Sequence, residues 1–211
     1  MDTLRFVNLL PEHAAQLAEL QKICYPHTPL EALYKEHEFV RHTAVFPEGT
    51  FVVLEGERVV AVGAGVFIDF DFEHPDHDLD KFVGGSYENH NPDGAWYYGT
   101  EIGVQPDYRG RGIARRLYDL RKGLVARYNK RGFVAGGVLP GYARYRSQMS
   151  AQAYVDRVVA EEIFDSTLSV QLNNGFTVHG VLKDYFPDSQ TGGWASLIMW
   201  ENPDYRKEEH G

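Results

Sequence analysis

The segment from residue 109 to residue 114 combines the residue types that bind a phosphate group. It reads Arg109-Gly110-Arg111-Gly112-Ile113-Ala114. Because glycine has no Cβ, a pyrophosphate can approach the backbone closely at Gly110 and Gly112. Arg109 and Arg111 can add charge-assisted hydrogen bonds to the same anion. We therefore predict that this segment binds a pyrophosphate.

The place of this segment between a strand and a helix favours the same interpretation. Residues 95–104 are predicted to form a strand that Pro106 ends, and residues 110–130 repeat apolar side chains at helical spacing. A helix N-terminus offers free backbone N–H groups and a positive dipole end to a phosphate. The simpler alternative is a surface turn with exposed arginines. Two other phosphate motifs do not fit, because Arg115 replaces the third glycine of a dinucleotide fingerprint and a P-loop sequence is absent.

Positive charge is concentrated near this turn in a chain that is otherwise acidic. The formal net charge of −9 argues against a nucleic-acid-binding surface. Six basic residues nevertheless fall within one short stretch: Arg109, Arg111, Arg115, Arg116, Arg121 and Lys122. The surplus of acidic residues elsewhere suits a cationic amine substrate.

Glu101 is a second candidate for chemistry, because it lies inside the strand that is predicted before the turn. Strand alternation places Thr100, Ile102 and Val104 on one face and Glu101 on the other. A carboxylate within a sheet suggests a functional role, such as a general base. The alternative is a solvated or salt-bridged residue of the strand.

The elements that must position these residues are predicted to form one α/β (α+β) domain over residues 1–211. Strand, helix and strand around the turn imply a right-handed parallel crossover. Residues 69–93 have little periodicity and are predicted to be a mobile loop or an irregular lid. The other expected strands are 3–9, 50–54, 58–70, 132–139, 175–182 and 194–200, and the other expected helices are 11–24, 30–42, 150–163 and 165–173.

Composition is that of a soluble globular protein, with 43% hydrophobic and 24% charged residues. No run approaches the roughly 18 apolar residues of a membrane span, and the first residues lack the apolar segment of a secretory signal. The single cysteine, Cys24, excludes an internal disulfide and suits a reducing cytosol, so we expect a cytoplasmic protein. We interpret Cys24 as a structural thiol rather than a nucleophile.

Residues 71–78 contain two histidines and several carboxylates, which could suggest a metal site. No predicted helix fixes the spacing of these side chains, and an acidic run is typical of a solvated loop. We therefore expect no metal.

Residues 104–114 resemble the cofactor-binding signature of the GNAT superfamily of N-acetyltransferases, whose core reads Arg/Gln-x-x-Gly-x-Gly/Ala. Residues 109–114 match this core in full, and the order of the predicted elements is also similar. The resemblance implies a mixed central sheet of about seven strands flanked by helices. It also implies that acetyl-CoA is the co-substrate, that no metal is used, and that the acetyl group passes directly to a small-molecule or peptide amine.

Four further segments resemble a narrower group. Residues 139–142, 149–155, 171–176 and 184–188 look like the acetyltransferase portion of proteins that fuse such a domain to a carbon–nitrogen hydrolase of the nitrilase type. This sequence contains no such hydrolase portion.

The resemblance also implies roles for residues of the strand before the turn. The pantetheine is expected to bond to backbone groups near Ile102 and Val104, and Glu101 falls where many relatives place the general base. Many relatives carry a tyrosine as the general acid at the position of Gln171, and glutamine cannot donate a proton in that way.

Three alternatives therefore remain for the leaving thiolate. A tyrosine beyond the next strand could protonate it, with Tyr142 preferred here over Tyr145 and Tyr154. The thiolate could instead leave unassisted or through water. The third alternative is a catalytically weak CoA-binding or regulatory module. The exposed edges of the sheet are consistent with a homodimer, and no membrane partner is expected.

Overall fold

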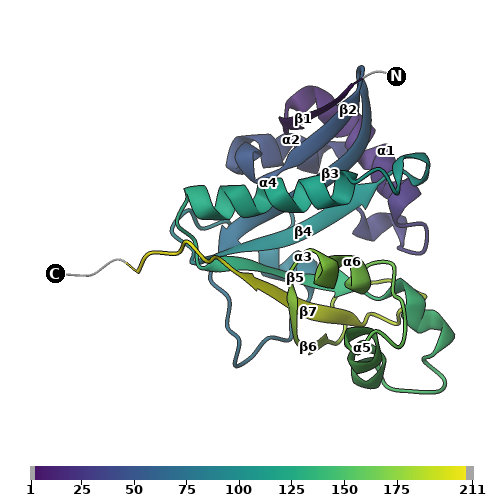
Figure 1. Cartoon of the computed structure of the whole chain (residues 1–211). Helices are drawn as coiled ribbons and strands as arrows, with labels where there is room; N and C mark the ends of the chain where they lie inside the picture. The colour runs from purple at the N-terminus through teal and green to yellow at the C-terminus, as the bar shows by residue number, and fades with distance from the viewer. Residues whose placement is uncertain (1–2, 208–211) are drawn as a thin grey trace.

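A mixed sheet with the strand order β1-β2-β3-β4-β5-β7-β6 runs through the protein (Figure 1). The computed structural model describes residues 3–207. Neighbouring strands are antiparallel except for β4 and β5, which are parallel. The strands are β1 (Leu4–Asn8), β2 (Phe51–Glu55), β3 (Arg58–Ile68), β4 (Trp96–Val104), β5 (Gly132–Val138), β6 (Thr177–Leu182) and β7 (Ala195–Glu201). The predicted α/β class and the seven-stranded sheet are thereby confirmed.

Helices cover both faces of the sheet. On one face α1 (Ala14–Cys24) and α2 (Glu36–Val45) pack on β2 and β3, and α3 (Leu79–Val83) packs on β4, β5 and β7. The opposite face carries α4 (Ile113–Arg127), which crosses the sheet in front of β3 and β4 in Figure 1. Near it lie α5 (Ala151–Val159) and α6 (Leu168–Asn173). Short 3-10 helices are η1 (Pro11–His13), η2 (Leu30–Ala32), η3 (Pro47–Gly49), η4 (Pro106–Tyr108) and η5 (Pro140–Arg144).

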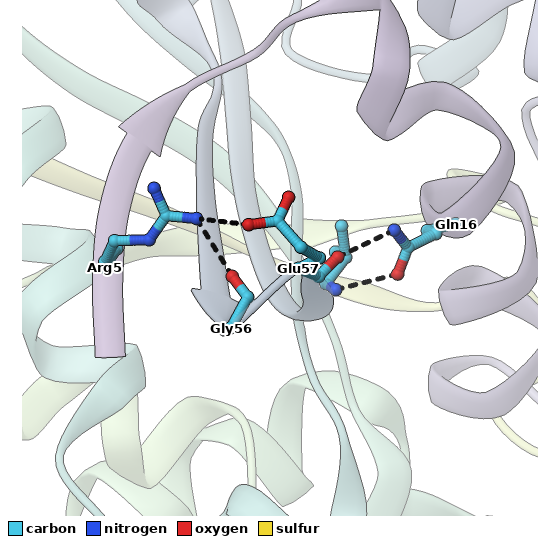
Figure 2. A network of polar contacts seen from close by, with 5 residues as sticks. Arg5, Gln16, Gly56 and Glu57 are labelled. Atoms are coloured by element: carbon cyan, nitrogen blue, oxygen red, sulfur yellow. Dashed lines mark hydrogen bonds and ion pairs between the residues drawn. The ribbon is translucent and has the colours of Figure 1, made fainter. Parts of the chain in front are cut away.

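The tight turn between β2 and β3 is joined to both β1 and α1 (Figure 2). Gly56 has φ +60°, a left-handed conformation that glycine adopts without strain. Arg5 donates hydrogen bonds to the Gly56 carbonyl at 2.9 Å and to the Glu57 carboxylate at 3.3 Å. The Gln16 side chain donates to the Glu57 carbonyl at 3.0 Å and accepts from the Val59 amide at 2.9 Å. These bonds fix α1 against the sheet, so the residues at its C-terminal end have a defined position over β4.

The two parallel strands β4 and β5 separate halfway along their length. They pair only from Trp96 to Gly99 on β4 and from Gly132 to Ala135 on β5. Beyond these residues β4 stays paired with β3 and β5 stays paired with β7. The sheet therefore opens into a gap toward the C-terminal ends of both strands.

A bulge in β4 lies at the start of this gap. Opposite the bulge, Ala64 pairs with Glu101 while Gly65 pairs with Gly99, so Thr100 has no partner on β3. The Thr100 hydroxyl lies 2.8 Å from that of Tyr87, in the core beneath α3, whereas Ile102 packs beneath α4. The expected alternation, with Thr100 and Ile102 on one face, is therefore wrong because a bulge shifts the facing of the residues beyond it.

Two connecting segments differ from their predictions. Residues 30–42 do not form one helix, because Leu33 is extended and the Tyr34 amide donates to the Gln21 side chain at 3.0 Å. Residues 69–93, expected as a loop, contain α3, which Asp78 caps by accepting from the Lys81 amide. Within residues 3–207 no helix is long and apolar enough to cross a membrane.

Candidate functional site

A cavity of about 850 Å³ occupies the gap between β4 and β5. Its walls come from the exposed edges of both strands, the turn before α4, the end of α1, and parts of α3 and α6. Gly136 and Gly137 of β5 line the cavity. A Cβ on Gly136 would collide with the side chain of Tyr185, and a Cβ on Gly137 would collide with that of Gln171. The cavity therefore depends on glycine at both positions to keep these side chains close to the strand.

The glycine turn forms one end of the cavity. Gly110 and Gly112 have φ angles of +75° and +76°, and no atom lies within 4 Å of where their Cβ atoms would be. The first hydrogen bond of α4 runs from the Arg116 amide to the Gly112 carbonyl. No side chain caps the helix, so the amides of its first turn are free to bind an anion. Both glycines line the cavity, together with Ile113 and Ala114.

The arginines of the turn point in different directions. Arg109 lines the cavity and donates through Nε to the Val104 carbonyl at 3.1 Å. Arg115, one turn into the helix, lines it as well. Arg111 does not: its guanidinium donates to the Asp107 carbonyl at 2.9 Å and lies 4.8 Å from the centre of the Tyr108 ring. In this arrangement the Arg111 guanidinium is directed toward Asp107 and Tyr108, so its predicted contact with the anion stays a prediction.

Glu101 lines the middle of the cavity with its side chain almost enclosed. Only 8% of the residue is exposed, and neither carboxylate oxygen has a hydrogen-bond partner among residues 3–207. Burial without a compensating cation raises the pKa of Glu101 to about 8. Its backbone is held in place by Arg121, whose Nη1 donates to the Glu101 carbonyl at 3.3 Å. This carboxyl can therefore change protonation state near neutral pH.

We expect the stability of the protein to report this raised pKa. The Glu101 carboxyl is neutral in the folded protein up to about pH 8 but ionises near pH 4.5 in the unfolded chain. Its contribution to stability is thus fully present below pH 4.5 and is lost as the pH rises toward 8. One pKa unit corresponds to about 1.4 kcal/mol. The free energy of unfolding of Glu101→Gln, relative to that of the native chain, should therefore increase by several kcal/mol as the pH rises from 5 to 8.5. Urea unfolding of both proteins at the two pH values measures this, and a pH-independent difference would contradict it.

The tyrosines beyond β5 lie outside the cavity. Tyr142 is 5% exposed, donates its hydroxyl to the Met149 carbonyl at 3.1 Å and packs against the Tyr154 ring. Tyr154 donates to Asp165 at 2.8 Å, and Tyr145 packs on Tyr154. None of the three lines the cavity, so the structure gives no support to Tyr142 as a general acid.

Gln171 occupies the wall of the cavity that faces β5. It is 4% exposed, and its Oε1 is buried without a hydrogen-bond partner among the described residues. The Tyr118 side chain, from α4, also lines the cavity, and burial raises its pKa. The amide of Gln171 can thus orient neighbouring groups, although it carries no acidic proton.

Several other cavity residues were not singled out by the sequence. Tyr25 and Tyr34 come from the segments after α1, and the Tyr25 hydroxyl donates to the Ile102 carbonyl at 3.0 Å. Burial is the main cause that raises the pKa of Cys24 to about 11, with the charge of Glu101 adding to it. The thiol therefore stays protonated, in agreement with its structural interpretation. Cys24-Tyr25 at the end of an amphipathic helix was the only local signal for this group.

The histidines and carboxylates of residues 71–78 do not converge. His74 pairs with Asp71 at 3.0 Å on the surface, while His77 turns inward and lies 2.7 Å from the Tyr98 hydroxyl. No group of three or more residues within residues 3–207 is arranged to hold a metal ion.

Comparisons with known proteins agree with this geometry. A model of the acetyltransferase (GNAT) family matches residues 14–125, more than half of the 211 residues. Over 205 residues the chain is 36% identical to the probable hydrolase YhcX of Bacillus subtilis (strain 168). That match covers 96% of this chain but only 39% of YhcX, so the chain spans about two fifths of this relative.

Two further likenesses extend over nearly the whole chain. Over 208 residues it is 29% identical to YkwB of the same strain, an uncharacterized N-acetyltransferase, covering 98% of this chain and 92% of YkwB. The structure of GphF, a GNAT-like decarboxylase in complex with isobutyryl-CoA, aligns with a TM-score of 0.79 at 18% identity. That alignment covers 94% of this chain and 99% of the other, and it shows a shared fold.

Proposed function

This chain belongs to the GNAT family of acetyltransferases, and we propose that it transfers an acetyl group directly from acetyl-CoA to a primary amine. The observation that carries the proposal is the buried, unpartnered carboxyl of Glu101 in a cavity that opens at one end onto the glycine turn. A base with a pKa near the working pH is suited to take a proton from an ammonium group. The family match supports coenzyme A as the acyl carrier.

The chemistry of the cavity lining supports coenzyme A as the ligand. The free amides at the start of α4 and the side chains of Arg109 and Arg115 would hold the pyrophosphate. The unpaired edge of β4 around Ile102 to Val104 would offer backbone groups to the pantetheine. The Ile102 and Val104 carbonyls already accept hydrogen bonds from Tyr25 and Arg109, so the remaining contacts fall to other backbone groups of this edge.

In the proposed reaction, the Glu101 carboxylate takes one proton from the ammonium group of the acceptor. The neutral nitrogen then attacks the thioester carbon, a C–N bond forms, and the C–S bond breaks. The departing thiolate takes up a proton from water that reaches the cavity, and a second proton lost by nitrogen goes to solvent. Gln171 and Tyr118 lie beside the gap and can offer hydrogen bonds to the sulfur during this step.

A weak or purely binding role is the second candidate, and Gln171 is the observation that favours it. A residue without an acidic proton stands where many relatives are expected to carry a tyrosine. Such a module would bind coenzyme A with the same residues but release no thiol.

Titration calorimetry with acetyl-CoA and with CoA, followed by a free-thiol release assay over a panel of amines, separates the two candidates. We expect micromolar binding of both ligands and thiol release that depends on the amine. Binding without release from any amine would favour the binding module. Absence of binding would overturn the coenzyme A assignment itself.

A further inference from the structure

The basic and the acidic side chains that line the cavity come from different parts of its wall. All of the lysine and arginine side chains that line it come from the glycine turn and α4: Arg109, Arg115 and Arg121. On the opposite face of the sheet, α3 contributes Asp80 to the lining. The segment after β6 contributes Asp188, whose carboxylate accepts hydrogen bonds from the Gln190 and Thr191 amides. The half of the cavity beyond Glu101 is therefore acidic, while the coenzyme half is basic.

Asp80 is the centre of a group of carboxylates that lack cationic partners. It is exposed, and its pKa is raised by partial burial and by the charges of Asp78, Glu38 and Glu88. A Cβ on Gly85 would lie 3.7 Å from a carboxylate oxygen of Glu88 and 3.9 Å from one of Asp80, so these two carboxylates lie close together.

None of these four carboxylates belongs to an ion pair among residues 3–207. Of the nearby lysines, Lys35 donates to the Leu30 carbonyl and Lys81 forms no ion pair. Like charges held together without a counterion favour the binding of a cation.

Two buried polar groups in the same cavity lack hydrogen-bond partners among the described residues. Glu101 has two unpartnered carboxylate oxygens, and the Thr191 hydroxyl, in a residue only 2% exposed, has no hydrogen-bond partner among the described residues. Both residues line the cavity. Because an unpaired buried polar group is costly, their presence points to a polar ligand in this cavity.

The aromatic side chain of Tyr34 lines the same cavity as Asp80 and Glu101. After burial and Tyr87, the charges of Glu101 and Asp80 are the next causes that raise the pKa of Tyr34. On the same wall, the rings of Tyr25 and Phe186 lie edge to face with their centres 6.4 Å apart. Aromatic faces beside carboxylates attract alkylammonium groups.

We propose that the acceptor is a diamine or polyamine, with one nitrogen at Glu101 and a second, cationic nitrogen held by Asp80. The transfer step rests on the function proposed above and has the same balance of atoms and protons. The binding of the second nitrogen is independent of that step and can be measured without turnover.

The test compares acceptors that differ only in the second charge. Thiol release is measured with butane-1,4-diamine, spermidine and butan-1-amine at fixed acetyl-CoA. We expect kcat/KM for the diamine to exceed that for the monoamine by about tenfold, the effect of one favourable charge contact of about 1.4 kcal/mol. In Asp80→Asn this ratio should fall toward one. Asp156→Asn, at an exposed residue of α5 outside the cavity, is the matched control and should keep the ratio.

Equal kcat/KM values for the diamine and the monoamine, or a ratio that Asp80→Asn leaves intact, would overturn the inference. Thiol release from other amines only would also overturn it while leaving the acetyltransferase function in place. If no amine releases thiol, the proposed function fails, and calorimetry of spermidine with the CoA complex decides the inference. Binding that Asp80→Asn weakens about tenfold would support it, and absence of binding would overturn it.

Discussion

Replacing Gly112 with aspartate is expected to abolish the binding of coenzyme A. The new carboxylate would project into the open space beside the free amides of α4, where the pyrophosphate is proposed to bind. It would repel the phosphates and occupy the positive end of the helix dipole itself. At φ +76° a side chain is also strained, which distorts the turn. We expect the Kd for acetyl-CoA in titration calorimetry to rise at least about 100-fold, equivalent to about 2.7 kcal/mol.

Gly123→Asp is the matched control, because it adds the same charge to the same helix. Gly123 is exposed, no atom lies within 4 Å of its Cβ position, and it does not line the cavity. This variant should bind acetyl-CoA like the native protein. A Gly112→Asp protein that melts normally and binds acetyl-CoA with native affinity would contradict the assignment of the glycine turn.

The fold could be predicted wherever a segment has one strong local pattern. The predicted strand 95–104 became β4 and the predicted helix 110–130 became α4, within a few residues, because apolar periodicity and Pro106 mark their limits. The prediction of one helix over residues 30–42 was wrong, because the Tyr34 amide donates a hydrogen bond to the Gln21 side chain. Gln21 is thirteen residues away, and no local pattern records this bond.

The candidate site could be predicted only at the glycine turn, where the backbone conformation itself forms the site. The glycines at residues 110 and 112 have the left-handed conformation that the motif requires. The other side of the cavity is built from α1, α3 and α6, which meet only in the folded chain. The bulge at Thr100 depends on the register with β3, and the position of Tyr142 depends on how residues 140–149 pack. Such contacts between distant segments leave no periodic signal in the sequence.

Replacing Glu101 with glutamine is expected to lower turnover by about 100-fold at pH 8, the lower end of the contribution of a general base. Glutamine has nearly the same volume and can remain buried, but it cannot accept the proton of the acceptor. In the native protein the carboxyl, with a pKa of about 8, is mostly neutral at pH 7 and becomes a carboxylate above pH 8. The kcat/KM of the native protein should therefore rise with pH through about 8, and Glu101→Gln should lose this inflection while keeping the Kd for acetyl-CoA.

Glu201→Gln is the control for this substitution, because Glu201 is an exposed glutamate at the end of β7 and does not line the cavity. It should keep both the turnover and the pH profile of the native chain. The acceptor amine also titrates, so the profiles of the native and variant proteins are compared with the same amine, and only their difference belongs to the carboxyl. An unchanged turnover and an unchanged inflection in Glu101→Gln would show that Glu101 is structural, and the proton would then have to leave through another group of the cavity.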